Sequence, residues 1–535
     1  MDIRRIKTVC VTSMLLIGFY IGGCGDGGRE RTLGLVLDRE LGTTIGSLAE
    51  VVSLDLIGVE GYGVVGGLRG TGSAECPPNL RAYLEQYILK QLPESGMNVE
   101  RFISSHDTAV VSVQGQMPGA VLKNQHFDVR VSALPGTQTT SLEGGWLYKA
   151  ELKQAGRSGM ATRVLAAAEG PVFIDTLGSG RTDKKAGFVL GGGTVLDEYP
   201  VSLVLRKPDF RIANAIRNRL NWRFGPNKAK AVSPRQIELN VPAQYGDRKQ
   251  RFISIVKAMY LAETREINRE RIKTFVGRLA VSEDKEASEI ALEAIGNESL
   301  RKLSALLNSR YEEVRLRAAR CMLNLGSDVG LETLVKIAMD KASAYRVEAL
   351  EAVTTAARRN DAAAIARLLL QDEDFNIRLA AYEQLRKLDD IAVTRRPIAR
   401  SFYLEQIAQT AHKAIFVSRS GKPRIVLFGA PIFCRDNIFV QSANGEITID
   451  SRAGQKYVSL MRKHPTRPTM IGPLKSSLEV GDIIKTLCEE LVRRTEEARS
   501  GLGVSYADMI ALLKQMCEKG AIEAEFRAGP LLGID

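Results

Sequence analysis

The spacing of apolar residues changes twice along the chain and divides it into three parts. In the first part apolar and polar residues alternate, as at 127–133, where Phe127, Val129 and Val131 share one face. Such alternation is typical of a half-buried strand. Further strands are predicted at 108–114, 146–152, 163–167, 199–205 and 236–241, and helices at 80–92 and 210–223. The first part is therefore expected to be α+β.

The middle part, from about residue 285 to 388, is rich in Ala, Leu and Arg and lacks proline, which favours helices throughout. A short motif recurs there, and its arginines Arg315, Arg346 and Arg378 are 31 and 32 residues apart. The pattern resembles HEAT-type helical repeats, in which each helix pair buries its apolar face against its neighbours. The resemblance implies that these arginines reach an acidic or carbonyl group of the adjacent unit. Because the period is shorter than is usual for HEAT repeats, a plain helical bundle is the alternative.

In the last part the short alternating runs return. Strands are predicted at 424–428 and 437–441, joined as a hairpin around Pro431, with a short strand at 447–449 and a loop at 462–469. Helices are predicted at 480–498 and 506–519, and a final strand at 522–526. The predicted fold class is α+β, with mixed strand and helix domains in two sequence segments interrupted by an all-α, HEAT-like solenoid.

The first residues follow a pattern of their own. Basic residues at positions 4–7 precede an apolar run at 9–20, which is too short to span a bilayer and indicates a secretory signal peptide. Gly22 and Gly23 then stand directly before Cys24, an arrangement that resembles the lipobox of bacterial lipoproteins. That resemblance implies cleavage before Cys24 and a diacylglycerol lipid on its thiol. An ordinary signal peptide with a chance cysteine is the alternative.

Charge is distributed unevenly along the chain. The net charge is +12, yet residues 281–390 hold 16 Lys and Arg against 20 Asp and Glu. For an exported protein we expect anionic lipid head groups, cell-wall polymers or acidic protein surfaces as partners, and no nucleic acid. The basic stretch at 206–257 is either a solvated helix face or a contact to a neighbouring subunit or an anionic partner.

The sequence holds no constellation that predicts catalysis, a cofactor or a metal. No C-x-x-C, nucleophile elbow, Walker motif or H-E-x-x-H is present, and the four histidines lack ligand spacing. The odd number of downstream cysteines leaves disulfide pairing open, with Cys488 and Cys517 as one possible pair. Residues 61–66 satisfy G-x-G-x-x-G, but no helix follows directly. Glycine-rich turns that let backbones pass closely explain this segment better.

The same glycine segment resembles the signature of the flagellar P-ring protein family. The signature positions are Gly61, Tyr62, Gly63, Gly66, Leu68, Gly70, Thr71 and Gly72. Further elements of the family follow in the expected order: D-V-x-V-S at 128–132, Gly144 and Gly145 in S-L-x-G-G, Pro208, Asp209 and Phe210 in L-x-L-R-x-P-D-F, and closing elements at 502–513 and 520–525. The resemblance covers residues 56–260 and 400–526. Three features depart from the family pattern, namely Ser73 in place of Asp, the lipoprotein-type signal peptide and the helical middle part.

The resemblance implies a structural protein, not an enzyme. It implies a homo-oligomeric ring in the periplasm that surrounds a flagellar rod as a bushing, with flagellar rod and L-ring proteins as partners. A lipid on Cys24 would hold this ring to a membrane, with the outer membrane favoured. In this interpretation the helical array projects from the ring as a partner-binding arm. The alternative is a lipid-anchored envelope adaptor that uses the array to bind a protein partner and has no flagellar role.

These patterns predict a domain order. It comprises a signal peptide at 1–23, a leash at 24–34, a P-ring-like N-terminal region at 35–265, HEAT-like repeats at 281–390 and a P-ring-like C-terminal region at 400–535.

Overall fold

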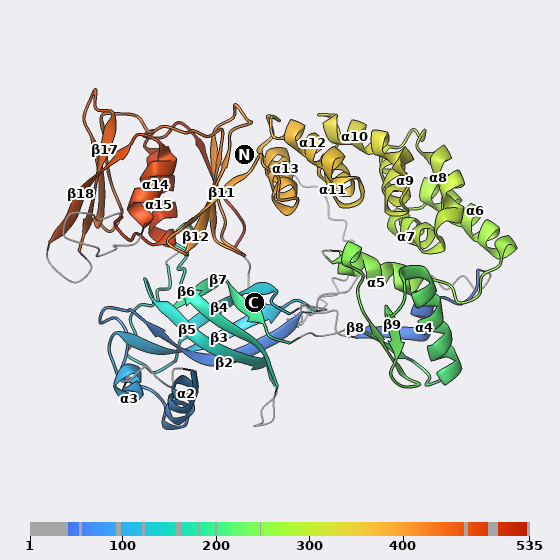
Figure 1. Ribbon diagram of the computed structural model, residues 1–535, viewed down its shortest axis with the longest axis horizontal. Helices are drawn as coiled ribbons and strands as arrows, with labels where there is room; N and C mark the ends of the chain where they lie inside the picture. The colour runs from blue at the N-terminus through green and yellow to red at the C-terminus, as the bar shows by residue number, and fades with distance from the viewer. Residues whose placement is uncertain are drawn as a thin grey trace, which may run out of the picture.

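The computed structural model describes residues 41–531 except 53–55, 92–97, 120–122, 157–162, 179–181, 198–200, 247, 465–468 and 490–500. The predicted signal peptide, Cys24 and the leash lie outside the described residues. The predicted α+β fold class is confirmed, because strands fill the early and late parts of the chain and helices fill the middle. Figure 1 shows four units near the corners of a square.

The first unit is a closed antiparallel barrel in the strand order β2-β3-β4-β7-β6-β5. Its strands are β2 (Ile57–Gly66), β3 (Thr108–Met117), β4 (His126–Ala133), β5 (Trp146–Gln154), β6 (Val164–Pro171) and β7 (Ala186–Val195). Helices α2 (Pro78–Gln91) and α3 (Val99–Ile103) lie against its outside. Valine, leucine and alanine side chains from alternate positions fill the interior. Strand β7 was not predicted, because the glycines at 191–193 interrupt its alternation.

The second unit is a small antiparallel sheet in the order β1-β8-β10-β9, covered by helices. Its elements are α1 (Ile45–Leu48), β1 (Ala49–Val52), β8 (Val201–Leu205), α4 (Phe210–Phe224), β9 (Ala229–Ala231), β10 (Gln236–Leu239), the 3-10 turn η1 (Ala243–Tyr245) and α5 (Lys249–Ala258). The Asp209 side chain caps α4 by accepting from the backbone N–H of Arg211 at 2.7 Å. Gly225 ends α4 with a φ of 103°.

The third unit is the helical array, which forms the upper right of Figure 1. Its helices are α6 (Arg265–Val281), α7 (Lys285–Ile295), α8 (Leu300–Leu306), α9 (Glu312–Asn324), α10 (Leu331–Met339), α11 (Arg346–Ala356), α12 (Arg359–Leu369) and α13 (Phe375–Lys387). Helices α7, α9, α11 and α13 stack in sequence and form the inner layer of the array, on the side toward α5. Helices α8, α10 and α12 form the outer layer on the opposite side. Their apolar faces form two continuous cores.

The fourth unit packs two helices between two sheets. One sheet has the order β11-β12-β14-β13-β19 and the other the order β15-β16-β17-β18. The elements are β11 (Thr394–Ile398), β12 (Phe402–Ile407), β13 (Ala414–Val417), β14 (Arg424–Phe428), β15 (Ile438–Gln441), β16 (Ile447–Ser451), β17 (Tyr457–Lys463), β18 (Met470–Ser477), α14 (Val480–Cys488), α15 (Tyr506–Glu518) and β19 (Glu525–Ala528).

The predicted hairpin around Pro431 is wrong. Strand β14 lies between β12 and β13, whereas β15 pairs with β16 in the other sheet. The segment between β14 and β15 buries Ile432 and Cys434 in the core between the sheets. It therefore carries the chain from one sheet to the other instead of turning it back.

Two other boundaries in this unit differ from the prediction. Arg462, expected at the start of a loop, lies in β17, where its buried guanidinium donates to the carbonyl oxygen of Leu502 at 2.9 Å. Helix α14 ends at Cys488, and most of the remaining predicted helical residues lie outside the described part of the chain.

Candidate functional site

The signature segment begins as a strand, not as a series of turns. Residues 57–66 form β2, which pairs with β3 on one side and β5 on the other and so closes the barrel. A methyl group added to Gly61 would lie 2.2 Å from the carbonyl oxygen of Glu151, and one added to Gly63 would lie 2.9 Å from the Cβ of Ala150. These glycines are needed because β5 passes too closely for any side chain.

The turns come at the end of the signature, at residues 67–72. Gly70 has a φ of 91°, which favours glycine, and a Cβ on Gly72 would lie 2.1 Å from the carbonyl oxygen of Thr108. The hydroxyl of Thr71 donates to the carbonyl oxygens of Leu68 and Ser141, at 2.9 and 2.8 Å. The turn is therefore fastened inside the unit.

Two other signature elements pack onto this turn. The side chain of Leu68 is buried, and a Cβ on Gly145 would lie 2.4 Å from Cγ1 of Val65 and 2.7 Å from Cδ2 of Leu68. Gly144 turns the chain there with a φ of 73°. The close backbone approach expected from these glycines thus lies within the barrel of one chain.

Tyr62 differs from the other signature residues because its side chain is 46 % exposed. It lines a groove of about 750 Å³ between the barrel wall and α2. Tyr83 and Leu80 of α2 form the opposite side, and Glu151 and Lys153 of β5 add charge to it. Tyr62 is therefore a signature residue that faces outward into a groove.

A further signature residue, Asp128 on β4, connects the barrel to the fourth unit. Its carboxylate accepts from the backbone N–H of Gly191 at 2.5 Å and from that of Gly421 at 2.9 Å. Arg419, in the same loop as Gly421, donates to Asp175 at 3.1 Å. The sequence identified Asp128 as part of the D-V-x-V-S element. Its partner Gly421 lies 293 residues away, so this contact is visible only in the fold.

The helical array is joined to the small sheet unit through a buried ion cluster. Arg251 of α5 contacts Glu289 of α7 at 2.7 Å and also contacts Glu293. Arg320 and Arg317 of α9 approach the same Glu289 carboxylate at 2.6 and 3.3 Å. The Glu289 side chain is fully buried. Burial alone would raise its pKa, but the guanidinium groups of Arg251 and Arg320 outweigh that effect and lower the pKa to about 2.

The other end of the array is joined to the fourth unit in a similar way. Glu405 of β12 is fully buried, accepts a hydrogen bond from the hydroxyl of Tyr382 of α13, and contacts Arg386 at 3.1 Å. Burial raises the pKa of Tyr382. The rings of Phe375 and Tyr382 both pack on Phe428 of β14, with centroids 5.6 Å away. The array is thus held at both ends and does not project as a free arm, contrary to the expectation from sequence.

The repeat arginines lie in the first turns of α9, α11 and α13, and each donates to a backbone carbonyl that precedes its helix, Arg346 to that of Ala338 at 3.1 Å. Arg346 pairs with Asp372 of the next unit, and less than a tenth of either side chain is exposed. The other two donate to backbone carbonyls in the loop that precedes their own helix: Arg315 to residues 309 and 310, and Arg378 to residues 372 and 373.

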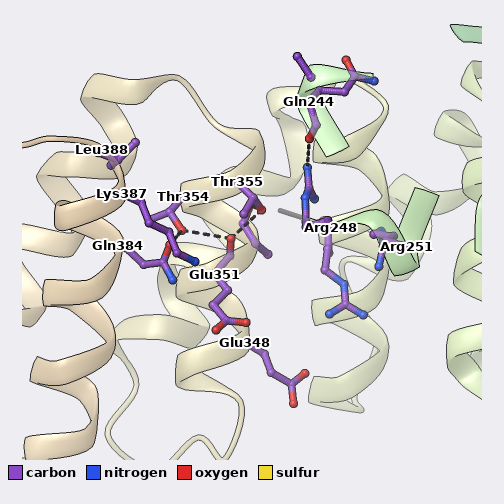
Figure 2. Close-up of a pocket in the computed structure, with 13 residues that line it drawn as sticks. Gln244, Arg248, Arg251, Glu348, Glu351, Thr354, Thr355, Gln384, Lys387 and Leu388 are labelled. Atoms are coloured by element: carbon purple, nitrogen blue, oxygen red, sulfur yellow. Dashed lines mark hydrogen bonds between the residues drawn. The ribbon is translucent and has the colours of Figure 1, made fainter. Parts of the chain in front are cut away.

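A cleft of about 510 Å³ lies between the array and the small sheet unit (Figure 2). Gln244, Arg248 and Arg251 form one wall, and residues of α11 and α13 form the other. The hydroxyl of Thr354 donates to the Gln384 side chain at 3.0 Å. Carboxylates and cations both line this cleft, so it has no single sign of charge.

The basic stretch at 206–257 divides into two groups. Arg219 pairs with Glu263, Arg251 pairs with Glu289, and Arg248 donates to Asn324 at 2.9 Å. These cations fasten the array, a role that sequence inspection missed because their partners lie 38 to 76 residues away. Arg223 also contacts the array by donating to the carbonyl oxygen of Glu293 at 3.2 Å, whereas Arg211, Lys230 and Arg235 are exposed.

Within the described residues, no group of three or more His, Cys, Asp or Glu side chains is placed to hold a metal ion. Cys76, Cys321, Cys434, Cys488 and Cys517 are all free thiols. Among the helices that the structure describes, none is both long and apolar enough to cross a bilayer.

Comparison with known proteins confirms the resemblance that the signature predicted. Residues 44–290 match the family model described as flagellar P-ring protein. The matched range contains the barrel, the small sheet unit, α6 and the first half of α7. The family is a structural one and not an enzyme family.

Curated relatives named flagellar P-ring protein agree with this match. The relative from Anaeromyxobacter dehalogenans strain 2CP-C is 29% identical over 227 residues, which is 40% of this chain and 58% of the relative. That from Aeromonas hydrophila is 31% identical, over 38% of this chain and 57% of the relative. That from Thermotoga maritima is 30% identical, over 37% of this chain and 60% of the relative. The chain therefore spans about three fifths of the length of the relatives it matches.

Proposed function

We propose that this chain is a structural subunit of a periplasmic ring of the flagellar P-ring type, which surrounds a rod as a bushing. The observation that carries the proposal is the match over residues 44–290, which contains the closed barrel and its signature turn. Ring formation needs one surface of each copy to bind a different surface of the next. The Tyr62 groove supports this, because it is hollowed, partly aromatic and lined in part by the signature residues Gly61 and Tyr62.

In this ring the helical array acts as a strut within each subunit. Buried charges hold it to the small sheet unit at one end and to the fourth unit at the other. Helices α7, α9, α11 and α13 lie on the side of the array toward α5 of the same chain (Figure 1). A free adaptor arm would instead present those helices to a partner, so the structural role is favoured over the adaptor role.

The remaining expectations complete the proposal. A lipid on Cys24 would hold the ring against the outer membrane, and flagellar rod and L-ring proteins would be its partners. The resemblance of residues 400–526 to the family supports including the fourth unit in the same ring. Each of these statements extends the sequence argument and has its own experimental consequence.

Electron microscopy of the detergent-extracted full chain tests the proposal. We expect closed rings of uniform diameter, and we expect Tyr62→Ser to reduce their number at unchanged expression. Tyr403→Ser, which alters an exposed tyrosine on β12, serves as the matched control. Particles that stay monomeric at every protein concentration would refute the ring.

A further inference from the structure

The small sheet unit carries most of the net charge of the protein. Residues 206–257 hold 13 Lys and Arg against three Asp and Glu, whereas the whole chain has a net charge of +12. Arg219 and Arg251 are neutralised by buried or half-buried carboxylates of the same chain. Among the described residues, Arg211, Arg217, Lys228 and Arg235 form no ion pair, so their charges can attract an anionic surface.

Helix α4 gathers part of this excess on one exposed face. Ala213, Ile216 and Leu220 face the core, so positions 211, 215, 218 and 222 point outward on the opposite side. Arg211 begins this outward stripe and Trp222 ends it. Arg217 lies beside the stripe, and its guanidinium contacts only the neighbouring Asn218 among the described residues.

The same face exposes large aromatic side chains. Trp222 is 75 % exposed and Phe210, at the other end of α4, is 63 % exposed. The guanidinium of Arg219 lies 4.9 Å from the centre of the Trp222 ring. In Figure 1, α4 lies at the outer edge of the molecule, away from the barrel and the fourth unit. We call Phe210, Arg211, Arg217 and Trp222 the α4 face.

The adjoining hairpin extends the α4 face with further cations. Asn221 accepts from the backbone N–H of Lys228 at 2.9 Å, which places Lys228 beside the Trp222 end. At the other end, the backbone N–H of Asp209 donates to the carbonyl oxygen of Pro234 at 2.9 Å, next to the exposed Arg235. Cations thus flank both aromatic residues.

Exposed tryptophan and phenylalanine among unpaired Lys and Arg is the composition of a surface that rests on anionic lipid head groups. The aromatic rings enter the interfacial layer while the cations meet the phosphates. A second copy of this chain is the competing occupant. Its acidic part, residues 281–390, has a net charge of only −4 because 16 Lys and Arg accompany its acids. The charge balance therefore favours a bilayer.

We propose that the α4 face binds the surface of an anionic phospholipid bilayer. Helix α1 and strand β1, the first described elements, belong to the same unit as α4. The chain between Cys24 and Leu41 can span at most about 60 Å when fully extended. If Cys24 is lipidated, as proposed above, the lipid and the α4 face can reach the same bilayer. The basic patch then adds electrostatic attraction to the same anionic bilayer.

The test uses the full chain with Cys24→Ser, so that lipidation does not contribute. The chain has two tryptophans, Trp146 on the barrel and Trp222 on the α4 face. We expect vesicles of phosphatidylglycerol and phosphatidylcholine in equal amounts to shift the Trp222 fluorescence to shorter wavelength in the Trp146→Phe variant. The Trp222→Phe variant, which retains Trp146, should show no shift, and pure phosphatidylcholine vesicles should shift neither.

Charge variants with equal loss of charge separate the α4 face from net charge. Arg211→Gln with Arg217→Gln should weaken vesicle binding about 25-fold, since each cation near an anionic surface contributes about 5-fold. Arg301→Gln with Lys302→Gln removes two exposed cations of α8, away from the α4 face and its adjoining hairpin, and should leave binding nearly unchanged. Equal weakening in the two double variants would overturn the proposal. So would a Trp222 shift that depends on protein concentration without vesicles, because the occupant would then be a second copy.

These outcomes are independent of ring formation. Rings without vesicle binding would remove the α4 proposal and leave the proposed function intact. Circular dichroism verifies that each variant is folded, which we expect because the altered side chains within the described residues lie outside the core.

Discussion

The barrel and the junction between the helical array and the small sheet unit are held together by different physical means. In the barrel, strands approach so closely that Gly61 and Gly72 have no space for a methyl group, and the interior is apolar. At the base of the array, a fully buried carboxylate, Glu289, is surrounded by the guanidinium groups of Arg251, Arg317 and Arg320. The first arrangement depends on shape, whereas the second depends on charge.

The family match ends within the helix that carries the central carboxylate of this ion cluster. It ends at residue 290, inside α7 and directly after Glu289. Arg251 and Glu289 therefore both belong to the matched region, while Arg317 and Arg320 lie beyond it. The array is attached to the matched region through a helix that belongs to both, and additional arginines from α9 complete the cluster. A helical unit can be attached in this way with few contacts beyond the shared helix α7.

Removing the central charge should produce the largest effect. Glu289→Gln keeps the side-chain volume but leaves three guanidinium groups around an uncharged amide. We expect the free energy of unfolding of the array to fall by about 3–5 kcal/mol, the usual consequence of removing one partner from a buried ion pair. Urea unfolding followed by helical circular dichroism measures it.

Glu332→Gln is the matched control for this variant. Its carboxylate contacts Lys336 at 2.7 Å on the same array, but the Glu332 side chain is 79% exposed. No measurable change is expected, because solvent screens exposed pairs. Similar losses in both variants would mean that burial does not set the strength of the cluster.

Filling the close approach in the barrel should have the next largest effect. Gly61→Ala places a methyl group 2.2 Å from the carbonyl oxygen of Glu151, so β2 or β5 must shift. We expect a loss of about 1–3 kcal/mol, measured as faster hydrogen exchange of the β2 and β5 amides. Gly277→Ala in α6, where no atom lies within 4 Å of the added methyl, should instead stabilise the chain by about 1 kcal/mol. If both substitutions stabilise, the close approach does not constrain the barrel.

Lowering the pH should destabilise the Glu289 cluster before it destabilises the barrel. The pKa of Glu289 is lowered from 4.5 to about 2 in the folded protein. The unfolded chain therefore takes up the proton first, and the stability that the cluster contributes is complete above about pH 4.5 and is lost as the pH falls toward 2. Hydrogen exchange should show α7 and α9 losing protection at a higher pH than β2 and β3. If the amides of β2 and β3 lose protection at a higher pH than those of α7 and α9, the Glu289 cluster is not what makes the protein sensitive to acid.

Local sequence patterns predicted many individual elements correctly. The helix at 210–223 corresponds to α4, and the strand at 127–133 corresponds to β4. These elements have strong local signals, namely a capping aspartate and strict alternation. Strand β7 and the pairing of β14 lacked such signals, since glycine carries no polarity and strand neighbours are chosen by distant segments.

The candidate site follows the same division. The signature glycines could be recognised from sequence because a steric requirement restricts each position to one residue type. The contacts of Asp128 with Gly421 and of Arg251 with Glu289 could not be recognised from the sequence. A charged residue is written with the same letter whether its side chain is solvated or paired.

The amino-acid sequence by itself determined the α+β class, the helical middle part and the resemblance to the P-ring family, because periodicity and glycine spacing are local properties of the chain. Only the tertiary structure decided that the array is held at both ends, and that part of the basic stretch is buried while the α4 face remains exposed. The physical reason is that burial and ion pairing depend on which segments meet in space. The free energy of a charge depends on those neighbours and not on its own residue type.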